Sequence, residues 1–290
     1  MFTREKFDSL PKLEEMKFQY SYLPTLEGWG VYEDGVQIAV LDKEGETTFI
    51  QTSGFVDKDM AILIDFKLFK KRPEYQAICF EVPKEVALLP DTYETVFVGA
   101  ILIRAKYHNP GCNPDEAWPQ IEKMFKWLRT TDFYKCPASS VYHDSVEGGL
   151  CCHSLRVSKL VVDLMKCSKF NEVSKLGDAI FCALVHDWCK INLYEPYTKN
   201  VKNEETGVWE KVLAYRYTNN AVINLGHGVS SMFLANKFFR LSLEEASAIR
   251  WHMGAYRTTD DEFNELQNCN EQFLLVHLLQ FADQLSLVKY

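Results

Sequence analysis

The residues best suited to chemistry lie in the stretch "ALVHDWCK", residues 183–190, where His186 and Asp187 follow an apolar run. Ionisable side chains are costly to bury unless another group satisfies them. Two arrangements are open: a hydrogen-bonded structural pair, or a metal ion that binds both side chains. Lys190 follows three residues after the aspartate and adds a positive charge to either arrangement.

Further histidines and one more aspartate are spaced through the second half of the chain, each on or beside a segment with a helical pattern. Taken singly, each has an ordinary role as a packed histidine or a capping carboxylate. Together they form an ordered set that imidazole and carboxylate chemistry suits to Mn, Fe, Zn or Ni. The set comprises His153, His186, Asp187, His227, His252 and Asp283. We therefore predict that these side chains converge on a divalent metal centre.

This order resembles that of the HD superfamily of metal-dependent phosphohydrolases. The "HDWCK" of this chain stands where the family commonly reads "HDIGK", so Trp188 and Cys189 depart from its pattern. The stretch "YHDSVEGGLCCHSL", residues 142–155, is similar to the Y/F-H-x-x-x-x-G-G-L-x-x-H segment of one subgroup. That subgroup includes bacterial 3′→5′ exoribonucleases and relaxase-associated proteins, and "GHGVSSMFL" resembles it too. The resemblance covers roughly residues 115–290.

The resemblance implies metal ligands residue by residue. His153, His186, Asp187 and Asp283 match the family's mononuclear set, and His227 and His252 match the histidines that its dinuclear members add. Asp187 would then bridge two ions. A water between those ions would become acidic enough to attack phosphorus near neutral pH.

Two residues of the "HDWCK" segment carry the implied catalytic roles. Asp187 is one of them, and Lys190 would stabilise the phosphate or protonate the leaving group. The ordinary alternative for Lys190 is an exposed lysine at a helix end. The implied cofactor is one or two divalent ions, of Mn, Fe, Ni, Zn or Mg.

Other polar residues near these segments admit two roles each. His143 could contact substrate or orient a ligand, or it could simply pack in a loop. Gly148 and Gly149 would permit a close approach into the helix of His153. A long insertion, residues 194–224, carries basic and aromatic side chains that could meet a phosphate or a base, although an ordinary solvated hairpin accounts for them as well. They are Lys199, Lys202, Lys211, Tyr194, Tyr197, Trp209 and Tyr215.

Helical patterns must position most of these residues. Apolar spacing predicts helices over 114–129, 154–167 and 172–190, and over 242–253, where Ser242 and Glu245 form a capping box. Asn113 and Pro114 predict the start of the first of these. The last helix, 270–288, is expected to bury a seam made of Leu274, Leu278, Phe281, Leu285 and Val288. Within the insertion, "VWEKVLAYRY" is expected to form a hairpin.

The first half of the chain has a residue pattern that is typical of strands more than of helices. A helix is expected at 11–20, two short strands around Asp34-Gly35, and further strands over 46–52 and 95–105. We therefore predict an α+β or β-rich N-terminal domain, residues 1–112, of unknown role. A mainly α domain, residues 113–290, would carry the HD-type site.

The composition of the chain argues against several classes of function. The 290 residues carry a net charge of −8, which argues against a large footprint on duplex nucleic acid. The nine cysteines are scattered without a CxxC pair, as in a reducing cytosol, so we expect a cytoplasmic protein without structural zinc. No secretory signal is visible, and we expect no membrane span because no apolar run reaches about 20 residues.

Three functions remain in view. The first is a metal-dependent phosphohydrolase, a phosphomono- or phosphodiesterase, that cleaves a small phosphoester such as a nucleotide. The second is a single-strand 3′→5′ nuclease whose N-terminal domain binds nucleic acid. The third is a nucleotide-sensing protein that keeps the fold without turnover. The sequence indicates no oligomeric state.

Overall fold

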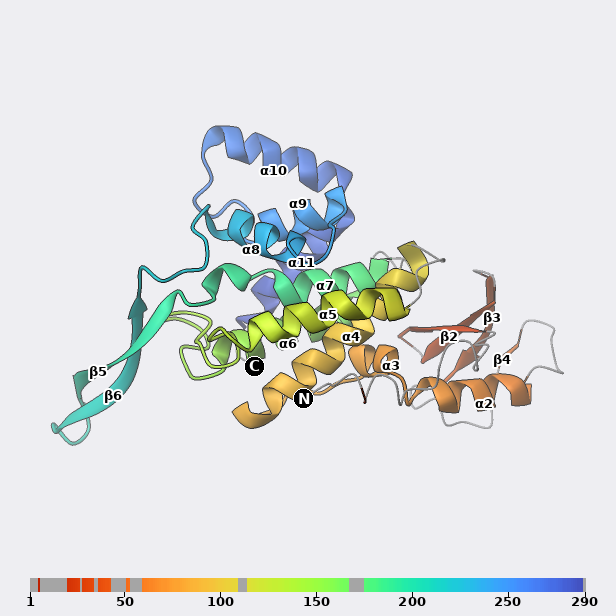
Figure 1. The fold of residues 1–290 in the computed structure, drawn as a ribbon, viewed down its shortest axis with the longest axis horizontal. Coiled ribbons are helices and arrows are strands. Elements are labelled where there is room, and N and C mark those ends of the chain that lie inside the picture. Colours follow the sequence, from red (N-terminus) through yellow and green to blue (C-terminus); the bar gives the residue numbers. More distant parts are fainter. Residues whose placement is uncertain are drawn as a thin grey trace.

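The computed structural model describes residues 20–42 except 27, 34 and 35, together with 51–52, 59–108, 114–166, 175–288 and residue 5. Within these ranges the chain is mostly helical, with a small antiparallel sheet near the N-terminus and a separate two-stranded hairpin. This confirms the predicted fold class. Figure 1 shows the sheet at one end of the molecule, the helices in the middle and the hairpin extending from the opposite end.

The N-terminal sheet has the order β1-β2-β3-β4, and each neighbouring pair is antiparallel. Its strands are β1 (Ser21–Pro24), β2 (Trp29–Glu33), β3 (Val36–Leu41) and β4 (Gln51–Thr52). The predicted pairing of the strands that flank Asp34-Gly35 is confirmed, although the two turn residues themselves lie outside the described part. The helix expected at 11–20 and most of the strand expected at 46–52 also lie outside it.

Helices α2 (Asp59–Phe69) and α3 (Pro73–Ile78) join this sheet to the rest of the molecule. Aromatic rings hold the junction, because Phe66 and Phe69 of α2 pack against Tyr22 and Trp29 of the sheet. Tyr75 of α3 stacks on Trp29 with ring centroids 5.4 Å apart. Rings paired in these geometries stabilise a core beyond their buried area.

The strand predicted over residues 95–105 is wrong, because this segment belongs to helix α4 (Leu89–His108), which follows a short turn, η2 (Val86–Leu88). Its apolar and β-branched residues suit burial on several faces as well as they suit a strand. Val96, Phe97, Val98 and Ala100 are fully or almost fully buried. Helical packing on α3 and α7 therefore overrides the local β preference.

Residues Val86–Ala105 also differ from the expectation that no segment is apolar enough to cross a membrane. The segment is 20 residues long with a mean hydropathy of 1.5, and 61% of its most apolar window is buried inside the fold. A core helix has these same properties, so they are weak evidence for a membrane span.

Helix α7 (Leu176–Val185) lies at the centre of the second half, and all ten of its residues are buried. Helices α4, α6, α9 and α11 pack around it. The surrounding elements are α5 (Pro114–Leu128), α6 (Gly149–Met165), η4 (Trp188–Lys190), α8 (His227–Asn236), α9 (Leu243–Trp251), α10 (Asp260–Gln272) and α11 (Leu274–Ser286). The capping box of Ser242 and Glu245 starts α9 as predicted. Asn113 lies outside the described residues, and Pro114 is the first residue of α5.

The predicted seam of α11 is wrong for most of its residues. Phe281, Leu285 and Val288 are 49%, 37% and 51% exposed. The buried face instead carries Leu275, Leu278, Leu279, Ala282, Asp283 and Ser286. The error matters for the site, because the rotation places Asp283 on the buried side of the helix.

The insertion forms a ribbon of β5 (Tyr194–Lys202) and β6 (Trp209–Tyr217), paired from Tyr194 with Tyr217 to Lys202 with Trp209. The expectation that "VWEKVLAYRY" forms a hairpin by itself is wrong, since it is one strand that pairs with residues 194–202. The domain boundary predicted at 112 falls among residues outside the described part. One buried core continues across it, from the sheet to α11.

Candidate metal centre

The helix ends and buried faces of the second half bring six imidazole and carboxylate side chains to one place. His153 lies in the second turn of α6, His186 and Asp187 follow the last residue of α7, and Asp283 lies on the buried face of α11. His227 is the first residue of α8, and His252 directly follows α9. All of the predicted metal ligands are therefore neighbours.

One group of ligand atoms surrounds the Nε2 atom of His153. This atom lies 3.1 Å from Oδ1 of Asp283, 3.2 Å from Nε2 of His186 and 3.4 Å from Oδ2 of Asp187. His186 Nε2 lies 3.8 Å from Oδ1 of Asp283. Ligands of one ion at 2.0–2.2 Å stand about 3 to 4 Å apart, so these spacings fit a shared cation. We call this group the inner set: His153, His186, Asp187 and Asp283.

A second group of ligand atoms surrounds the other carboxylate oxygen of Asp187. Oδ1 lies 2.8 Å from Nε2 of His227 and 3.6 Å from Nε2 of His252. The imidazole rings of these two histidines have centroids 5.1 Å apart. We call Asp187, His227 and His252 the outer set. Asp187 belongs to both sets because each of its oxygens faces a different pair of histidines.

Several polar atoms in these sets are buried without a hydrogen-bond partner. They include Oδ1 of Asp187 and Nε2 of both His227 and His252. Asp187 and His252 are 2% and 0% exposed, so water does not compensate them. Buried polar atoms are normally satisfied, and a group of them that faces one point indicates a binding site. These buried His and Asp residues are compatible with a metal ion.

The ring orientations also suit ligation. His186 and His252 each place Nδ1 within hydrogen-bond distance of a carbonyl three residues earlier, at 2.7 Å from Ala183 O and 2.8 Å from Ile249 O. Donation from Nδ1–H leaves the Nε2 lone pair free to face the centre. Such a partner on the far nitrogen is typical of metal-binding histidines.

The local environment favours ionised carboxylates, and it favours the neutral ring at His186 and His227 but not at His153. Burial lowers the pKa of His186 and of His227. Burial would raise the pKa of Asp187, but the positive charge of Lys190 and the neighbouring histidines hold it well below its usual range. Burial also lowers the pKa of His153, yet hydrogen bonds to Asp187 and Asp283 outweigh this effect and raise it. Ligands in these protonation states suit a divalent cation.

Lys190 lies in the centre rather than on the surface. It is 8% exposed, and its Nζ atom lies 2.6 Å from Oδ2 of Asp187. Burial lowers the pKa of this lysine, but the charge of Asp187, the hydrogen bond to it and the other nearby acidic groups together raise the pKa above its usual value, so the side chain is a cation. The alternative of an exposed lysine at a helix end is wrong.

His143 lies beside the inner set, with its ring centroid 5.2 Å from that of His153. Its Nε2 atom is buried without a hydrogen-bond partner, and burial lowers its pKa. The loop of His143 enters α6 through two glycines, as the sequence predicted. Gly148 has φ +74°, and a Cβ on Gly149 would lie 2.0 Å from the carbonyl oxygen of Asp144. Neither position accepts a side chain without a shift of the loop that approaches His153.

Two residues near the centre were not identified from the sequence as its neighbours. The hydroxyl of Ser286 lies 3.4 Å from Nδ1 of His153, one helical turn after Asp283. The sulfur of Cys189 lies 3.2 Å from Nδ1 of His227 and forms a group with Asp187 and His227. The spacing from Asp283 to Ser286 was a readable signal, because residues three apart share a helix face. Nothing in the sequence pairs Cys189 with a residue 38 positions later.

Several other polar side chains of this half do not contribute to the two sets. Trp188 points into the core, where its indole N–H donates to the hydroxyl of Tyr93 at 3.1 Å. Arg250 pairs with Glu262 at 2.8 Å. His277 lies 2.9 Å from the carbonyl oxygen of Asn270. The basic residues Lys199, Lys202 and Lys211 are exposed on the hairpin.

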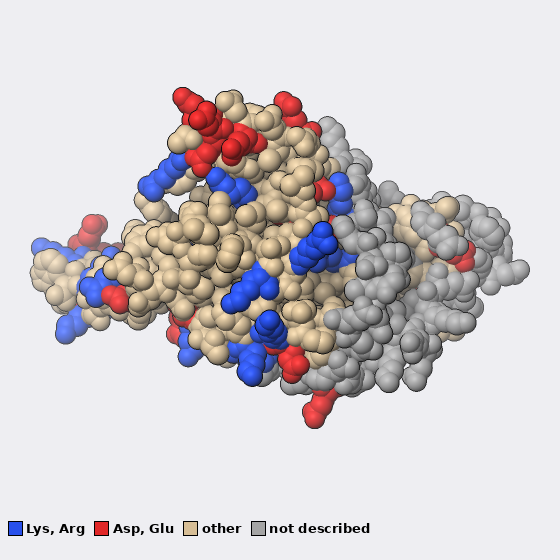
Figure 2. All heavy atoms as spheres, turned by 45° about the horizontal axis from the view of Figure 1, so that its top comes forward, with Lys and Arg blue, Asp and Glu red and all other residues tan. Residues whose placement is uncertain are grey.

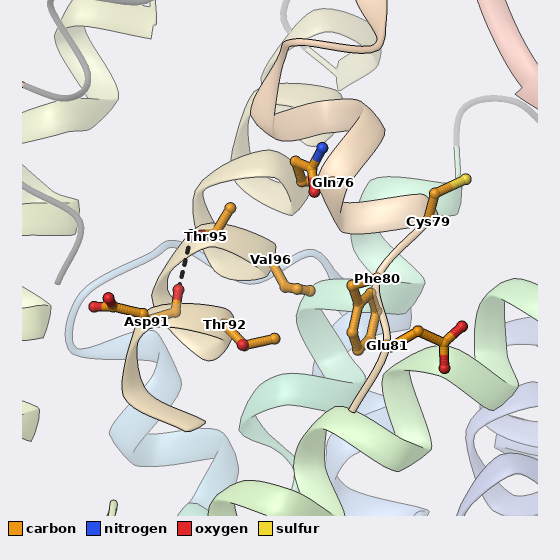
Figure 3. Close-up of a pocket in the computed structure, with 8 residues that line it drawn as sticks. All are labelled: Gln76, Cys79, Phe80, Glu81, Asp91, Thr92, Thr95 and Val96. Atoms are coloured by element: carbon orange, nitrogen blue, oxygen red, sulfur yellow. Dashed lines mark hydrogen bonds between the residues drawn. The ribbon is translucent and has the colours of Figure 1, made fainter. Parts of the chain in front are cut away.

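A pocket of about 290 Å³ lies away from this centre, between α3, the chain that follows it and α4 (Figure 3). Gln76, Cys79, Phe80, Glu81, Asp91, Thr92, Thr95 and Val96 line it. None of the predicted ligands contributes to its wall. The predicted ligand residues therefore gather at the candidate metal centre, not at this pocket.

Comparison of the chain with family models, curated proteins and solved structures yields no match. The assignment of the centre thus depends on its own geometry: two sets of ligand atoms, joined by one carboxylate, with a buried lysine beside them.

Proposed function

We propose that this chain is an HD-type, metal-dependent phosphohydrolase that cleaves a small phosphoester, with a nucleotide as its preferred class of substrate. The observation that carries the proposal is the position of Asp187. One of its oxygens faces the inner set and the other faces the outer set. The resemblance of the ligand order to the HD superfamily supports the same assignment.

The residues of the two sets would hold two divalent ions. His153, His186 and Asp283 would complete the inner site, and His227 and His252 the outer site, with Asp187 shared between them. Divalent ions in such a pair supply an acidified water as nucleophile and take up charge on the phosphate oxygens. The residues fit this role because three of their polar atoms are buried without a hydrogen-bond partner: Oδ1 of Asp187 and Nε2 of His227 and of His252.

Lys190 supplies a positive charge beside the predicted ligands. Its ammonium group donates to Oδ2 of Asp187, the oxygen that faces the inner set. A fixed positive charge in a buried position stabilises developing negative charge more strongly than one in water. Lys190 would therefore hold a phosphate oxygen or give a proton to the leaving oxygen. His143, whose Nε2 atom has no partner and whose ring lies 5.2 Å from that of His153, would contact the substrate.

A compact substrate fits the charge distribution better than a long polyanion. The hairpin from Tyr194 to Tyr217 carries four Lys or Arg and four Glu, so its net charge is zero. On the face shown in Figure 2, the basic residues of the described part are scattered over the helices and hairpin, and acids gather over α10. Single-strand binding requires a positively charged groove that follows the backbone.

One panel of assays tests the proposal against its alternatives. The protein would be incubated with nucleoside mono-, di- and triphosphates, a generic phosphodiester and single-stranded RNA, each with Mn²⁺ and with chelator. We expect metal-dependent cleavage of a nucleotide and none by Asp187→Asn protein. Cleavage of RNA alone would establish the nuclease alternative instead. A nucleotide that raises the melting temperature without turnover would establish the sensor.

A further inference from the structure

Some histidines of the centre follow the end of a helix, whereas His227 begins one. This difference determines which backbone groups can orient each ring. His186 and His252 follow the last turn of a helix, so a carbonyl three residues earlier is available to Nδ1. His227 is the first residue of α8, and the residues before it are not helical. No helical carbonyl precedes His227, so the partner for its Nδ1 must come from another segment.

Cys189 occupies that position. Its sulfur lies 3.2 Å from Nδ1 of His227, and Cys189 itself is 7% exposed. The backbone N–H of Cys189 also donates to the hydroxyl of Ser231 at 3.0 Å. His227 and Ser231 lie one turn apart on the same face of α8. Cys189 thus holds α8 at two points, one through its backbone and one through its side chain.

The hydrogen positions follow from the surrounding atoms. If the thiol donated to Nδ1, the ring proton would lie on Nε2, which is 2.8 Å from Oδ1 of Asp187. Neither of those two atoms has a hydrogen-bond partner. Donation from Nδ1–H to the sulfur leaves the Nε2 lone pair facing Asp187, which is 2% exposed.

Building on the proposed function, we infer that Cys189 is the positioning residue of the outer metal site, where its sulfur accepts a hydrogen bond from His227 and fixes the ring with Nε2 toward the ion. Thiol sulfur is a weak acceptor compared with the carbonyls that orient His186 and His252. The outer ion should therefore be held less tightly than the inner ion. Loss of such an orienting partner typically lowers metal affinity 10- to 100-fold.

The test compares Cys189→Ala and Cys189→Ser with wild type, and uses Cys182→Ala as a matched control. Cys182 is a fully buried thiol on α7 whose sulfur lies 3.9 Å from the carbonyl oxygen of Glu245, not at the ligands. Mn²⁺ titration by calorimetry should show one site weakened at least about tenfold in Cys189→Ala and the other unchanged. Cys189→Ser retains an acceptor and should recover most of the affinity. Unchanged affinities in Cys189→Ala would overturn the inference.

Two measurements distinguish a positioning role for Cys189 from direct ligation of the ion and from simple packing. With Co²⁺, wild type should lack thiolate-to-metal charge-transfer absorption, and its presence would overturn the inference by making Cys189 a ligand. In metal-free protein, nitrogen NMR of the imidazoles should show His227 protonated at Nδ1 in wild type, and a shift toward Nε2 in Cys189→Ala. An unchanged tautomer would overturn the inference. A wild type that binds no divalent ion would instead refute the proposed function, and the tautomer would still test Cys189.

Discussion

The Nε2 atom of His227 lies 2.8 Å from Oδ1 of Asp187, yet neither atom makes a hydrogen bond. The other oxygen of Asp187 is 2.6 Å from the ammonium group of Lys190. One oxygen of this buried carboxylate therefore accepts a hydrogen bond, and the other oxygen has no hydrogen-bond partner. A cation between Asp187 and the outer histidines would remove this imbalance, and the predictions below follow from that arrangement.

Lys190→Met should reduce phosphoester cleavage about 100-fold or more while metal content stays at the wild-type level. Methionine keeps much of the length and apolar volume but removes the buried charge beside Asp187. Steady-state turnover of the substrate found in the nucleotide panel and elemental analysis together measure this effect. Lys126→Met, at an exposed position of α5, is the control. Full activity in Lys190→Met would exclude the lysine from the chemistry.

Gly228→Ala should weaken the outer ion at least about tenfold and lower the free energy of unfolding by about 1 to 3 kcal/mol. A Cβ on Gly228 would lie 2.1 Å from the carbonyl oxygen of Arg250, so α8 must move away from α9. His227 and His252 would then separate. Mn²⁺ titration and urea unfolding measure the two effects. Gly207→Ala, whose Cβ would meet no atom within 4 Å, should retain both ions. An outer site of normal affinity in Gly228→Ala would show that helix spacing does not control it.

Divalent ions should stabilise the fold, and chelator should remove that stability. An ion present at 100 times its dissociation constant adds about 2.7 kcal/mol when only the folded chain binds it. The effect should decrease as the pH falls, because neighbouring carboxylates raise the pKa of His153 and protons then compete for this ligand. Thermal unfolding with Mn²⁺ or chelator at several pH values measures both trends. Melting temperatures that do not respond to Mn²⁺ would contradict a bound ion.

Asp178 should make the metal-free protein less stable as the pH rises. This side chain is 3% exposed and lies 3.4 Å from Arg104, which also pairs with Glu245. Burial and the charge of Glu245 raise the pKa of Asp178 to about 8. In the unfolded chain this acid titrates near 3.8. Its contribution is therefore most favourable below that value and is lost progressively as the pH rises to about 8.

Asp178→Asn removes this titration. The variant should gain stability relative to wild type between about pH 5 and pH 9, by on the order of 1 to 3 kcal/mol. Urea unfolding of both proteins at these two pH values, with chelator present, measures the difference. A constant difference between the two proteins across this range would show that Asp178 is ionised in the folded state at low pH.

The candidate ligand set was readable from the sequence because the order of its histidines and aspartates resembles that of the HD superfamily. His153, His186 and His252 lie at helix ends or on helical segments that apolar spacing identifies. The errors arose where apolar residues fill more than one face. In α4, Phe97 and Val98 are both 0% exposed, so period 3.6 and period 2 were indistinguishable.

The rotation of α11 was predicted incorrectly for a related reason. Phe281 is apolar but exposed, whereas Asp283 is charged and buried, so a rule that buries apolar residues assigns the wrong face. The contact between Cys189 and His227 is a tertiary one, and local patterns carry no information about it. The sequence therefore identified the residues that converge, while the contacts that orient them required the structure.

The measurement that tests the central claim most directly is the metal content of wild type and Asp187→Asn after reconstitution with Mn²⁺, with the exposed substitution Asp163→Asn as control. Wild type and Asp163→Asn should bind two ions per chain, because two sets of ligands share one carboxylate. Asp187→Asn should bind none, since the substitution removes a charge from both sets at once. Full Mn²⁺ content in Asp187→Asn protein would contradict the account.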